Sequence, residues 1–539
     1  MESYLLCLIV FFPLLIGLAM LFVPGRYVKV WRFSAVFVSV IELILCSICY
    51  GIFSKGNFED LQFQIPWLRL SFGSFGWLFV DFHLKTDGLN LAMIMLSSLV
   101  FFVSNISSLS ITKFTKGYYL LIFLLMTSVF GCFLSHDFLL FFLFFEFMLL
   151  PMYFLIGIWG GERREYAAIK FFLYTLLGSV FILLVLIGTY SSVVVPIQEQ
   201  TRLISQEMAN NPDFKFGSSQ ASSSIHTLDF DFIFDNNNYL PGSLLDIKFN
   251  SFLFAWDSRT FLFFLFLIGF AIKLPAIPVH TWLPDAHVEA PTAISVILAG
   301  ILLKIGGYGI IKLVMPLFPD LFQKYAFIIG LFGVISMVYA GMAALAQKDL
   351  KKLIAYSSIS HMGFVMLGAA SLSREGLNGA IFQMVSHGLI SSLLFLLAGV
   401  IYERTHDREI AHYRGLATIM PNFAIFSAIA YFASLGLPAF SGFIAEFSVY
   451  MGAFNAVKAG ILPFWLVIIS LSSLLIGASY SLWVLQRMFF GQFWVKPSLD
   501  SFSLQDLTLR EWVMVLPLAL LIVLLGIMPS YLFDIINRF

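Results

Sequence analysis

Long apolar stretches separated by short polar turns make up most of this chain. A helix needs about 20 apolar residues to cross a membrane, and about fourteen windows reach that length. Windows 418–455 and 461–490 are longer than one crossing requires, which predicts bent or broken helices. The pattern predicts an all-α polytopic membrane protein. Its expected spans are 3–23, 30–52, 86–109, 117–135, 137–158, 165–190, 253–274, 292–315, 325–346, 353–371, 376–402, 418–455, 461–490 and 511–533.

Two of the predicted helices contain helix-breaking residues near their middle. In the seventh, the sequence KLPAIP (273–278) ends one half-helix and opens a stretch that closes at Pro291. In the twelfth, SLGLPAFSGFIAEF (434–447) loosens the helix shortly before Glu446. Broken helices at corresponding positions of two halves are typical of inverted-repeat transporters with sites near mid-membrane. We therefore expect two inverted five-helix repeats, helices 4–8 and 9–13, with helices 7 and 12 broken.

These elements divide the chain into four predicted parts. A polar insert at 191–252 is rich in Ser, Asp and Asn, which predicts a loop or a partly ordered extramembrane segment without chemistry of its own. The parts are N-terminal helices in 1–116, a first repeat in 117–315 that contains the insert, a second repeat in 325–490, and a C-terminal helix in 491–539.

Basic residues concentrate in every second predicted loop. The positive-inside rule assigns these loops to the inner side of the membrane. With an even number of spans, both termini and the polar insert should then lie on the outer, proton-rich side. The basic residues are Arg26, Lys29, Arg32, Lys113, Lys116, Arg163, Arg164, Lys348, Lys351, Lys352, Arg404, Arg408 and Arg414.

Composition supports the membrane assignment. Hydrophobic residues make up 60% of the chain and charged residues 12%, against about 25% charged in soluble domains. The formal net charge is zero, which argues against a nucleic-acid partner. Cys46 and Cys49 form a CxxC pair inside an apolar stretch, but further ligands are missing nearby, so a structural role is favoured over a metal site.

Three charged residues lie at depths where charge is costly. An ammonium at the bilayer centre costs about 2.5–3.5 kcal/mol on insertion scales, so it is retained mainly where it takes part in ion or proton movement. Lys273 stands beside the proline break, and Lys304 lies mid-helix among small residues. Glu146 follows a run of apolar residues and needs a cation to stay charged. We expect a buried Glu146–Lys273 ion pair; the alternatives are a static packing pair and, for Lys304, a lysine that extends to the interface.

Two histidines and a glutamate extend this series. His361 and His387 lie among serines, and imidazole can accept a proton on one nitrogen and release it from the other. Glu446 follows the break of helix 12 and is read as the acidic counterpart of Lys273 by repeat position. Taken alone, each histidine could equally be a core residue whose hydrogen bonds are all made. Because the two histidines lie between Lys304 and Glu446 in the sequence, a proton relay is favoured.

Other polar clusters argue against further chemistry. His280, Asp285, His287 and Glu289 are close in sequence, but the segment is interrupted by prolines and offers no regular face, so a polar re-entrant connection is favoured over a metal site. A P-loop and a dinucleotide-binding glycine motif after a strand are both missing. We expect no cofactor, metal or redox centre in this chain.

Several motifs resemble the antiporter-like subunits of respiratory complex I, the NADH:ubiquinone oxidoreductase. They are FFEFMLLPMYFLIGIWG, FAIKLPAIPVHTWLPDAHVEAPTAISVILAGILLKIGGYG, DLKKLIAYSSISHMGF, SHGLISSLLFLLAGVIYERTH and LPAFSGFIAEF. The resemblance spans helices 3 to 14, and the glutamate at 446 is similar to the subunit 4 (chain M) branch, since subunits 2 and 5 usually have lysine there. It implies a fourteen-helix core and a central hydrophilic axis. The axis residues would be Glu146, Lys273, Lys304, His387 and Glu446, with His361 close by.

The resemblance also implies a function and partners. Protons would cross an energy-transducing membrane, driven by electron transfer in other subunits, with antiporter-like subunits 2 and 5 as neighbours and lipids around them. A mitochondrial inner membrane is favoured over a bacterial plasma membrane, since 62 Phe residues suit an AT-rich organellar genome. One alternative is a self-contained sodium/proton antiporter. Another is a structural scaffold with fixed ion pairs.

Overall fold

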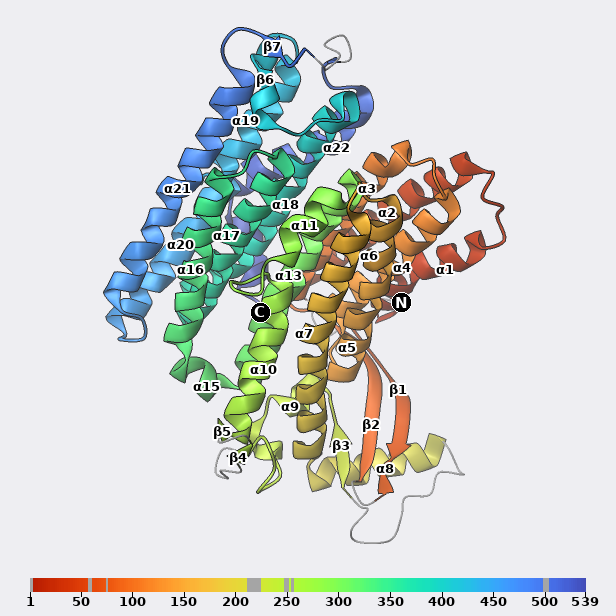
Figure 1. Cartoon of the computed structure of the whole chain (residues 1–539). Coiled ribbons are helices and arrows are strands. Elements are labelled where there is room, and N and C mark those ends of the chain that lie inside the picture. The colour runs from red at the N-terminus through yellow and green to blue at the C-terminus, as the bar shows by residue number, and fades with distance from the viewer. Residues whose placement is uncertain are drawn as a thin grey trace.

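Helices of similar direction fill most of the molecule (Figure 1). This computed structural model describes residues 3–56, 61–73, 76–210, 224–246, 252–253, 256–497 and 504–539. Within these ranges, eleven helical spans are long and apolar enough to cross a membrane. They are α2 (Val28–Ser54), α3 (Gly88–Ser107) with η2 (Ser108–Ser110), α4 (Thr115–Leu134), α5 (Phe138–Phe147) with α6 (Leu149–Trp159), α7 (Arg164–Ser192), the span from α12 to α14, α16 (Ala326–Leu345), α17 (Leu350–Ala370), α18 (Arg374–Thr405), α21 (Phe464–Phe489) and α22 (Leu509–Ile527).

Three further elements of the described chain complete the fourteen predicted crossings. One is the short N-terminal helix α1, and the other two are broken helices at the predicted seventh and twelfth positions. The thirteenth span, expected to be bent or broken, is one continuous helix, α21, so it is not broken. The bounds are α1 (Ser3–Met20), α10 (Ser258–Lys273) with α11 (Trp282–Glu289), and α19 (Pro421–Ser434) with α20 (Ser441–Lys458).

The order of spans agrees with two repeats of five. Spans four to eight and nine to thirteen each have a long, continuous third member, α7 and α18, followed by a broken fourth member. Because five is odd, a span and its equivalent five spans later run in opposite directions through the bundle. The repeats are therefore inverted, as expected from the two helix breaks.

The innermost helices carry most of the candidate residues. The α12–α14 span and α18 are completely buried over their apolar windows, and α17 nearly so, whereas α2, α7, α21 and α22 are buried over less than half of theirs. Lys304, His361 and His387 are on these inner helices. A charge there is surrounded by protein rather than lipid.

Local irregularities in the backbone lie next to two candidate residues. Helix α5 ends one residue after Glu146, and α6 begins at Leu149, because Pro151 cannot donate a backbone hydrogen bond to Phe147. Lys304 lies in α13 between two π-helical turns, an irregularity that often marks functional sites. The segments of this span are α12 (Thr292–Ile297), η5 (Leu298–Leu302), α13 (Leu303–Gly309), η6 (Ile310–Val314) and α14 (Met315–Leu317).

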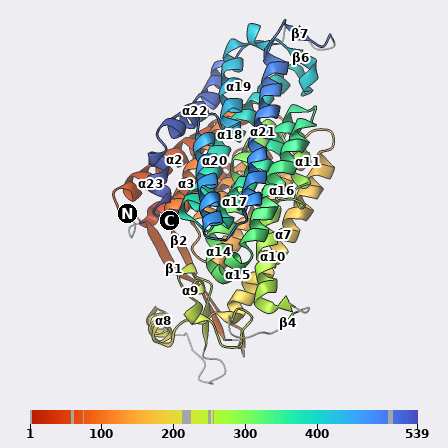
Figure 2. The same cartoon turned by 90° about the vertical axis from the view of Figure 1, so that its left-hand side faces the viewer.

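A β-hairpin, which the sequence pattern did not predict, extends from one end of the bundle (Figure 2). Strands β1 (Gln62–Ser71) and β2 (Trp77–Lys85) pair in antiparallel fashion, and β3 (Ile225–Thr227) from the polar insert adds to β2 in parallel. The insert, predicted as a loop or partly ordered segment, also forms helices, while 211–223 and 247–251 lie outside the described residues. Its other elements are α8 (Ile197–Asn210), α9 (Phe230–Ile233), η4 (Asn236–Asn238) and part of the β4–β5 pair (Phe252–Leu253 and Trp256–Asp257).

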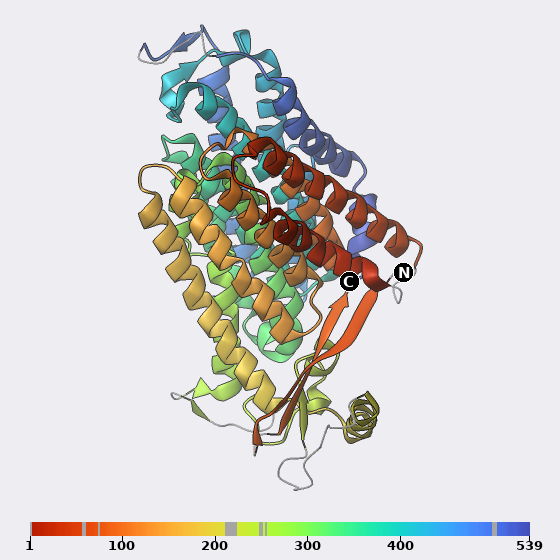
Figure 3. The same cartoon turned by 90° about the vertical axis from the view of Figure 1, so that its right-hand side faces the viewer.

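The two ends of the bundle carry different elements. The hairpin and the insert lie at one end, and both termini lie beside the base of the hairpin (Figure 3). Strands β6 and β7, which lie within loops predicted on the inner side, are at the opposite end (Figure 1). The positive-inside rule then assigns the hairpin end to the outer side. The remaining elements are α15 (Pro319–Lys324), η7 (Ile410–His412), β6 (Tyr413–Arg414), η8 (Leu416–Thr418), β7 (Trp494–Val495) and α23 (Ser530–Ile536).

Candidate functional site

A buried lysine–histidine hydrogen bond lies at the centre of the molecule. Lys304 has no exposed surface, and its Nζ lies 2.8 Å from Nδ1 of His387 on α18. Nζ also donates to the Ala299 carbonyl oxygen in the adjacent π-helical turn. Since the ammonium is the donor, Nδ1 of His387 is the acceptor, and the ring proton is assigned to Nε2. Lys304 thus points inward and does not extend to the interface.

A second histidine connects this pair to the break of helix 12. The ring centroids of His387 and His361 are 5.3 Å apart. His361 Nε2 lies 3.1 Å from the carbonyl oxygen of Ser434, the last residue of α19. A carbonyl at a helix C-terminus lacks its intrahelical partner, so the break itself provides this acceptor. The histidines are therefore in one row that runs from Lys304 to the broken helix.

Glu446 lies just beyond that break. It is 7% exposed, on α20. A methyl group added to Gly436 would come within 2.3 Å of Oε2 of Glu446, so the carboxylate packs directly on the backbone of the break. Lys273 is the last residue of α10, before the break of helix 7, whereas Glu446 follows the break of helix 12. The expectation that the two are counterparts by repeat position is wrong, because they lie on opposite sides of their breaks.

Lys273 and Glu146 are neighbours without direct contact. Lys273 Nζ is buried 4.1 Å from the centre of the Phe145 ring, and the charge of Glu146 acts on it. Both Nζ and Oε1 of Glu146 are buried without a hydrogen-bond partner among the described residues. The expected ion pair is thus replaced by an electrostatic interaction at longer range and by a cation–π contact, which is favourable for an ammonium over an aromatic face.

The helices that carry Lys273 and Lys304 pack closely against each other. A Cβ on Gly306 would lie 2.4 Å from the backbone nitrogen of Leu274, the residue after Lys273. Glycine at 306 therefore permits backbone-to-backbone approach of α13 and the end of α10. The two lysines belong to the same packed layer, although no hydrogen bond between described groups joins them.

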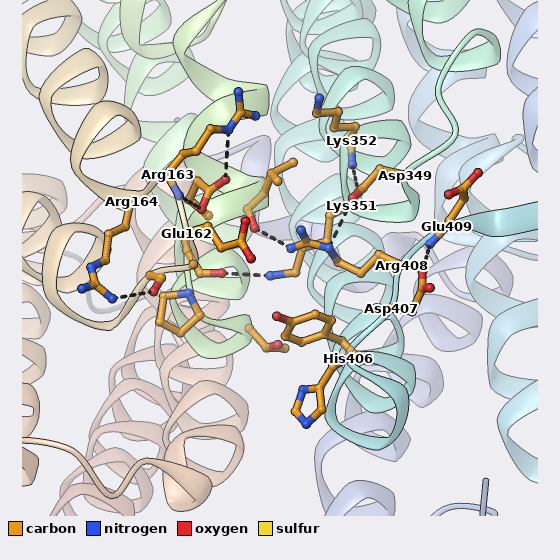
Figure 4. A pocket seen from close by; sticks show the side chains of 18 of the residues that line it. Glu162, Arg163, Arg164, Asp349, Lys351, Lys352, His406, Asp407, Arg408 and Glu409 are labelled. Carbon is orange, nitrogen blue, oxygen red and sulfur yellow. Dashed lines mark hydrogen bonds and ion pairs between the residues drawn. The ribbon is translucent and has the colours of Figure 1, made fainter. Parts of the chain in front are cut away.

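A charged cavity opens between the two repeats at the end opposite the hairpin. Its volume is about 890 Å³. Side chains from the α6–α7 turn, including Glu162 and Arg163, face Lys351 of α17 and Arg408 of the loop after α18 (Figure 4). The mixture of charges makes the cavity hydrophilic, in contrast to the apolar helices around it.

One carboxylate at the rim is held in its charged form. Desolvation raises the pKa of Asp407, but hydrogen bonds from the Glu409 amide and from His412 outweigh it and lower the pKa below its usual value. Asp407 Oδ1 is 2.7 Å from the Glu409 nitrogen and Oδ2 is 2.8 Å from His412 Nδ1. The rim therefore keeps its charge at neutral pH.

Two residues lie between this cavity and the Lys304–His387 pair. Lys351 lines the cavity yet is only 2% exposed, and its Nζ donates to the Ala290 carbonyl oxygen at 2.9 Å. His287 is fully buried, with both ring nitrogens unpartnered among the described residues, and the charges of Lys351 and Lys304 both act on it. Its ring stacks on Phe395 with centroids 4.4 Å apart. Ionisable groups therefore continue from the cavity to the central pair.

Comparisons with known proteins show the family of this chain. The model of the NADH:quinone oxidoreductase/Mrp antiporter transmembrane family matches residues 135–477. The chain is 42% identical to NADH-quinone oxidoreductase subunit M of Rickettsia conorii over 85% of its length and 82% of the relative. The chain belongs to this family. It is also 35% identical to NADH-ubiquinone oxidoreductase chain 4 of Chondrus crispus, over 96% of this chain and 93% of that one.

Solved structures of the family share the fold. A chain of respiratory complex I from Thermus thermophilus superposes with a TM-score of 0.75 at 27% identity, covering 98% of this chain and 96% of that one. A chain of the Mrp complex from Dietzia sp. DQ12-45-1b gives a TM-score of 0.77 at 19% identity, with 99% and 96% covered. The second likeness concerns the fold alone.

Within this family fold, sequence reasoning missed the two residues next to the charged cavity. Lys351 was counted only among the basic residues of an inner loop, but α17 begins at Leu350 and buries it. His287 was grouped with His280, Asp285 and Glu289, which the fold separates: Asp285 pairs with Lys170 at 2.7 Å and Glu289 accepts from the Arg163 amide. The available signal was the DLKK sequence: Asp349 is the N-cap of α17, so Lys351 lies in the first turn of the helix and not in the loop.

Proposed function

We propose that this chain is the proton-translocating subunit, of the M or 4 type, in the membrane arm of an NADH:quinone oxidoreductase. The observation that carries the proposal is the fully buried Lys304–His387 hydrogen bond, continued by His361 to the break of helix 12. A lysine at this depth is expensive unless its charge is used. Electron transfer in other subunits supplies the energy, and this chain moves the proton.

The row permits transfer in single proton steps. A proton that leaves the Lys304 ammonium for Nδ1 of His387 produces a neutral amine and an imidazolium. The imidazolium releases its other proton, from Nε2, so the ring returns to neutral. His361 is the next acceptor, and Glu446 receives the proton beyond the break. These groups interact, so their titration belongs to the set rather than to single residues.

Lys273 and Glu146 adjust the start of this row. Glu146 lies near the Lys273 ammonium without touching it, so the two charges attract each other. Lys273 exchanges protons with Lys304 across the close contact of α10 with α13. The pair thereby controls when Lys304 is charged.

The charged cavity supplies the protons. Water in a polar space of this size reaches Lys351, and His287 lies between Lys351 and the central pair. Both nitrogens of His287 are free of protein hydrogen bonds among the described residues, which suits a ring that must accept and release protons. We assign uptake from the inner side to this route.

The surroundings follow from the same assignment. Helix α7 exposes large apolar side chains, among them Leu173 at 57% and Ile187 at 53%. Such a face must be covered by lipid or by a neighbouring subunit, and we assign these neighbours to antiporter-like subunits 2 and 5. We place the complex in a mitochondrial inner membrane.

The decisive test uses the assembled complex in proteoliposomes, with NADH oxidation and proton uptake measured together. Lys304→Met and Glu446→Gln should each abolish most of the uptake while the complex still assembles. Lys324→Met and Glu375→Gln are matched controls, because both side chains are exposed and lie outside the row. Uptake that survives both core substitutions would assign the chain a scaffold role with fixed charges and overturn the proposal.

Proteoliposomes that contain this chain alone test the antiporter alternative. The full chain reconstituted alone should leave an imposed sodium gradient intact. Dissipation of that gradient by the isolated chain, abolished by Lys304→Met, would instead assign sodium/proton exchange.

A further inference from the structure

Three potential metal-binding side chains converge where the hairpin meets the polar insert, and His83 lies behind them. His83 comes from β2, His136 from the turn between α4 and α5, and Asp229 and Asp231 from the insert around the start of α9. His83 Nδ1 is 2.5 Å from Asp229 Oδ2, and His136 Nε2 is 2.9 Å from Asp231 Oδ1. Potential ligand atoms of His136, Asp229 and Asp231 all lie within 4.8 Å of one another. His136 and Asp231, 95 residues apart in sequence, and Asp229 thus present one imidazole and two carboxylates to one point.

The two carboxylates of the cluster carry more negative charge than the neighbouring lysine balances. The ammonium of Lys85 has its Nζ 3.1 Å from Asp231 Oδ1. Asp137, which forms a β-bridge with Asp229, adds no charge, because burial raises the pKa of its carboxyl well above the usual value. Burial also lowers the pKa of His136, so its ring is neutral. One lysine facing two carboxylates leaves room for a further cation.

A hydrogen bond from His83 orients one of the carboxylates. Gln62 Nε2 donates to His83 Nε2 at 2.9 Å, which assigns the ring proton of His83 to Nδ1, and Nδ1 donates it to Asp229 Oδ2. An outer hydrogen bond of this kind usually orients a metal-bound carboxylate.

We propose that His136, Asp229 and Asp231 bind one divalent transition-metal ion, with Zn²⁺ the best match and a water molecule as the fourth ligand. Zinc takes imidazole and carboxylate ligands in a tetrahedron with bonds of about 2.0–2.2 Å, which places ligand atoms about 3.4 Å apart. The three protein ligand atoms lie within 4.8 Å of one another, so they close on the ion when it binds. Lys85 Nζ lies 3.1 Å from Asp231 Oδ1 and 3.5 Å from His136 Nε2, so it competes with the ion and, being 35% exposed, can turn into solvent when the metal binds.

The site is accessible and would act as a staple. A cavity of about 720 Å³, lined in part by His83, Asp229 and Asp231, leads to it. A bound ion would join the α4–α5 turn and the insert, and would add its binding free energy to the stability of this outer region. This site was not predicted from the sequence, because its ligands are scattered along the chain and the insert was expected to lack chemistry.

Equilibrium dialysis of the full-length chain in nanodiscs against Zn²⁺ tests the site. We expect one ion per wild-type chain, with affinity reduced at least about 10–100-fold by Asp231→Asn or His136→Asn, as for other metal-site substitutions. Asp235→Asn is the matched control, because it changes the same group in the same insert at a helix cap that asparagine fills equally well. Lys85→Met should tighten binding, since it removes the competing ammonium.

Thermal unfolding provides a second measurement that does not depend on proton pumping. Zinc should raise the Tm of the wild-type chain and of Asp235→Asn but leave Asp231→Asn unchanged. Equal binding by wild type and Asp231→Asn, or weaker binding by Lys85→Met, would overturn the proposal. A variant that simply misfolds would be identified by a lower Tm without zinc, and the Lys85→Met result would then decide.

Discussion

Replacing Gly436 with alanine tests whether the exact position of Glu446 matters for proton movement. Gly436 has φ +76°, a left-handed conformation that costs a residue with a Cβ about 1–2 kcal/mol. The new Cβ would lie 2.3 Å from Oε2 of Glu446, against 3.4 Å for ordinary contact. The carboxylate must therefore move by about 1 Å. Misplacement of a reacting group by about that distance can lower a rate by about 100-fold.

Gly460 provides the matched control. It has φ +73°, but an added Cβ meets nothing within 4 Å. Gly460→Ala should therefore share the backbone penalty and lower the Tm of the complex by a similar amount, without affecting Glu446. The difference between the two variants isolates displacement of the carboxylate.

The assay is proton uptake by proteoliposomes during NADH oxidation, together with the Tm of each complex. We expect Gly436→Ala to lose most of its uptake while Gly460→Ala retains the wild-type rate. Equal uptake by the two variants would refute the reasoning, since the row of side chains would then tolerate a shifted terminal carboxylate.

Three further outcomes are expected. Arg404→Gln should destabilise the complex by about 3–5 kcal/mol, because it leaves a buried carboxylate without its opposite charge. In the wild type, the Glu511 carboxylate accepts two hydrogen bonds from Arg404, both at 2.8 Å. Thermal unfolding measures this loss, and an unchanged Tm would contradict it. Lys351→Met should slow proton uptake without altering assembly, which native electrophoresis of the same preparation checks. The pKa of Asp407 is lower than its ordinary value of 3.8, so the contribution of this carboxylate to stability is complete above pH 3.8 and is lost as the pH falls through the lowered pKa. Exchange of the Glu409 amide hydrogen, which is bonded to Asp407, should therefore accelerate only in strongly acidic solution.

Much of the architecture could be read from the sequence because the membrane constrains it. Every crossing must satisfy its own backbone, so length and hydropathy locate the helices. Pro275 and Pro438 revealed both breaks for the same reason, since proline cannot continue a helix. The hairpin was missed because its two strands, of 10 and 9 residues, are each too short for a crossing, and because β2 pairs with a segment far along the chain, Trp77 opposite Ile225.

The candidate site was predictable as a set of residues but not as a set of contacts. Lys304, His361 and His387 stood out because ionisable side chains in apolar helices are rare. Their partners did not, since the acceptors at Ala299 and Ser434 are backbone carbonyls, which every residue has. The Glu146–Lys273 pair failed as an expectation because opposite charge predicts proximity, while the side chain of Phe145 determines what the ammonium actually contacts.

Carbonyls at interrupted backbone are the hydrogen-bond partners of several buried ionisable groups in this molecule. Lys304 bonds to a carbonyl in a π-helical turn, His361 to the last carbonyl of α19, and Lys351 to the carbonyl that caps α11. Lys273 is itself the last residue of α10, where the negative end of the helix dipole stabilises a cation. Each break frees carbonyls that a continuous helix would use, and these carbonyls bind a proton-carrying group without trapping it in a salt bridge. A charge held by dipoles can leave, whereas a charge held by an opposite charge is fixed, and this difference explains why the breaks and the ionisable residues occur together.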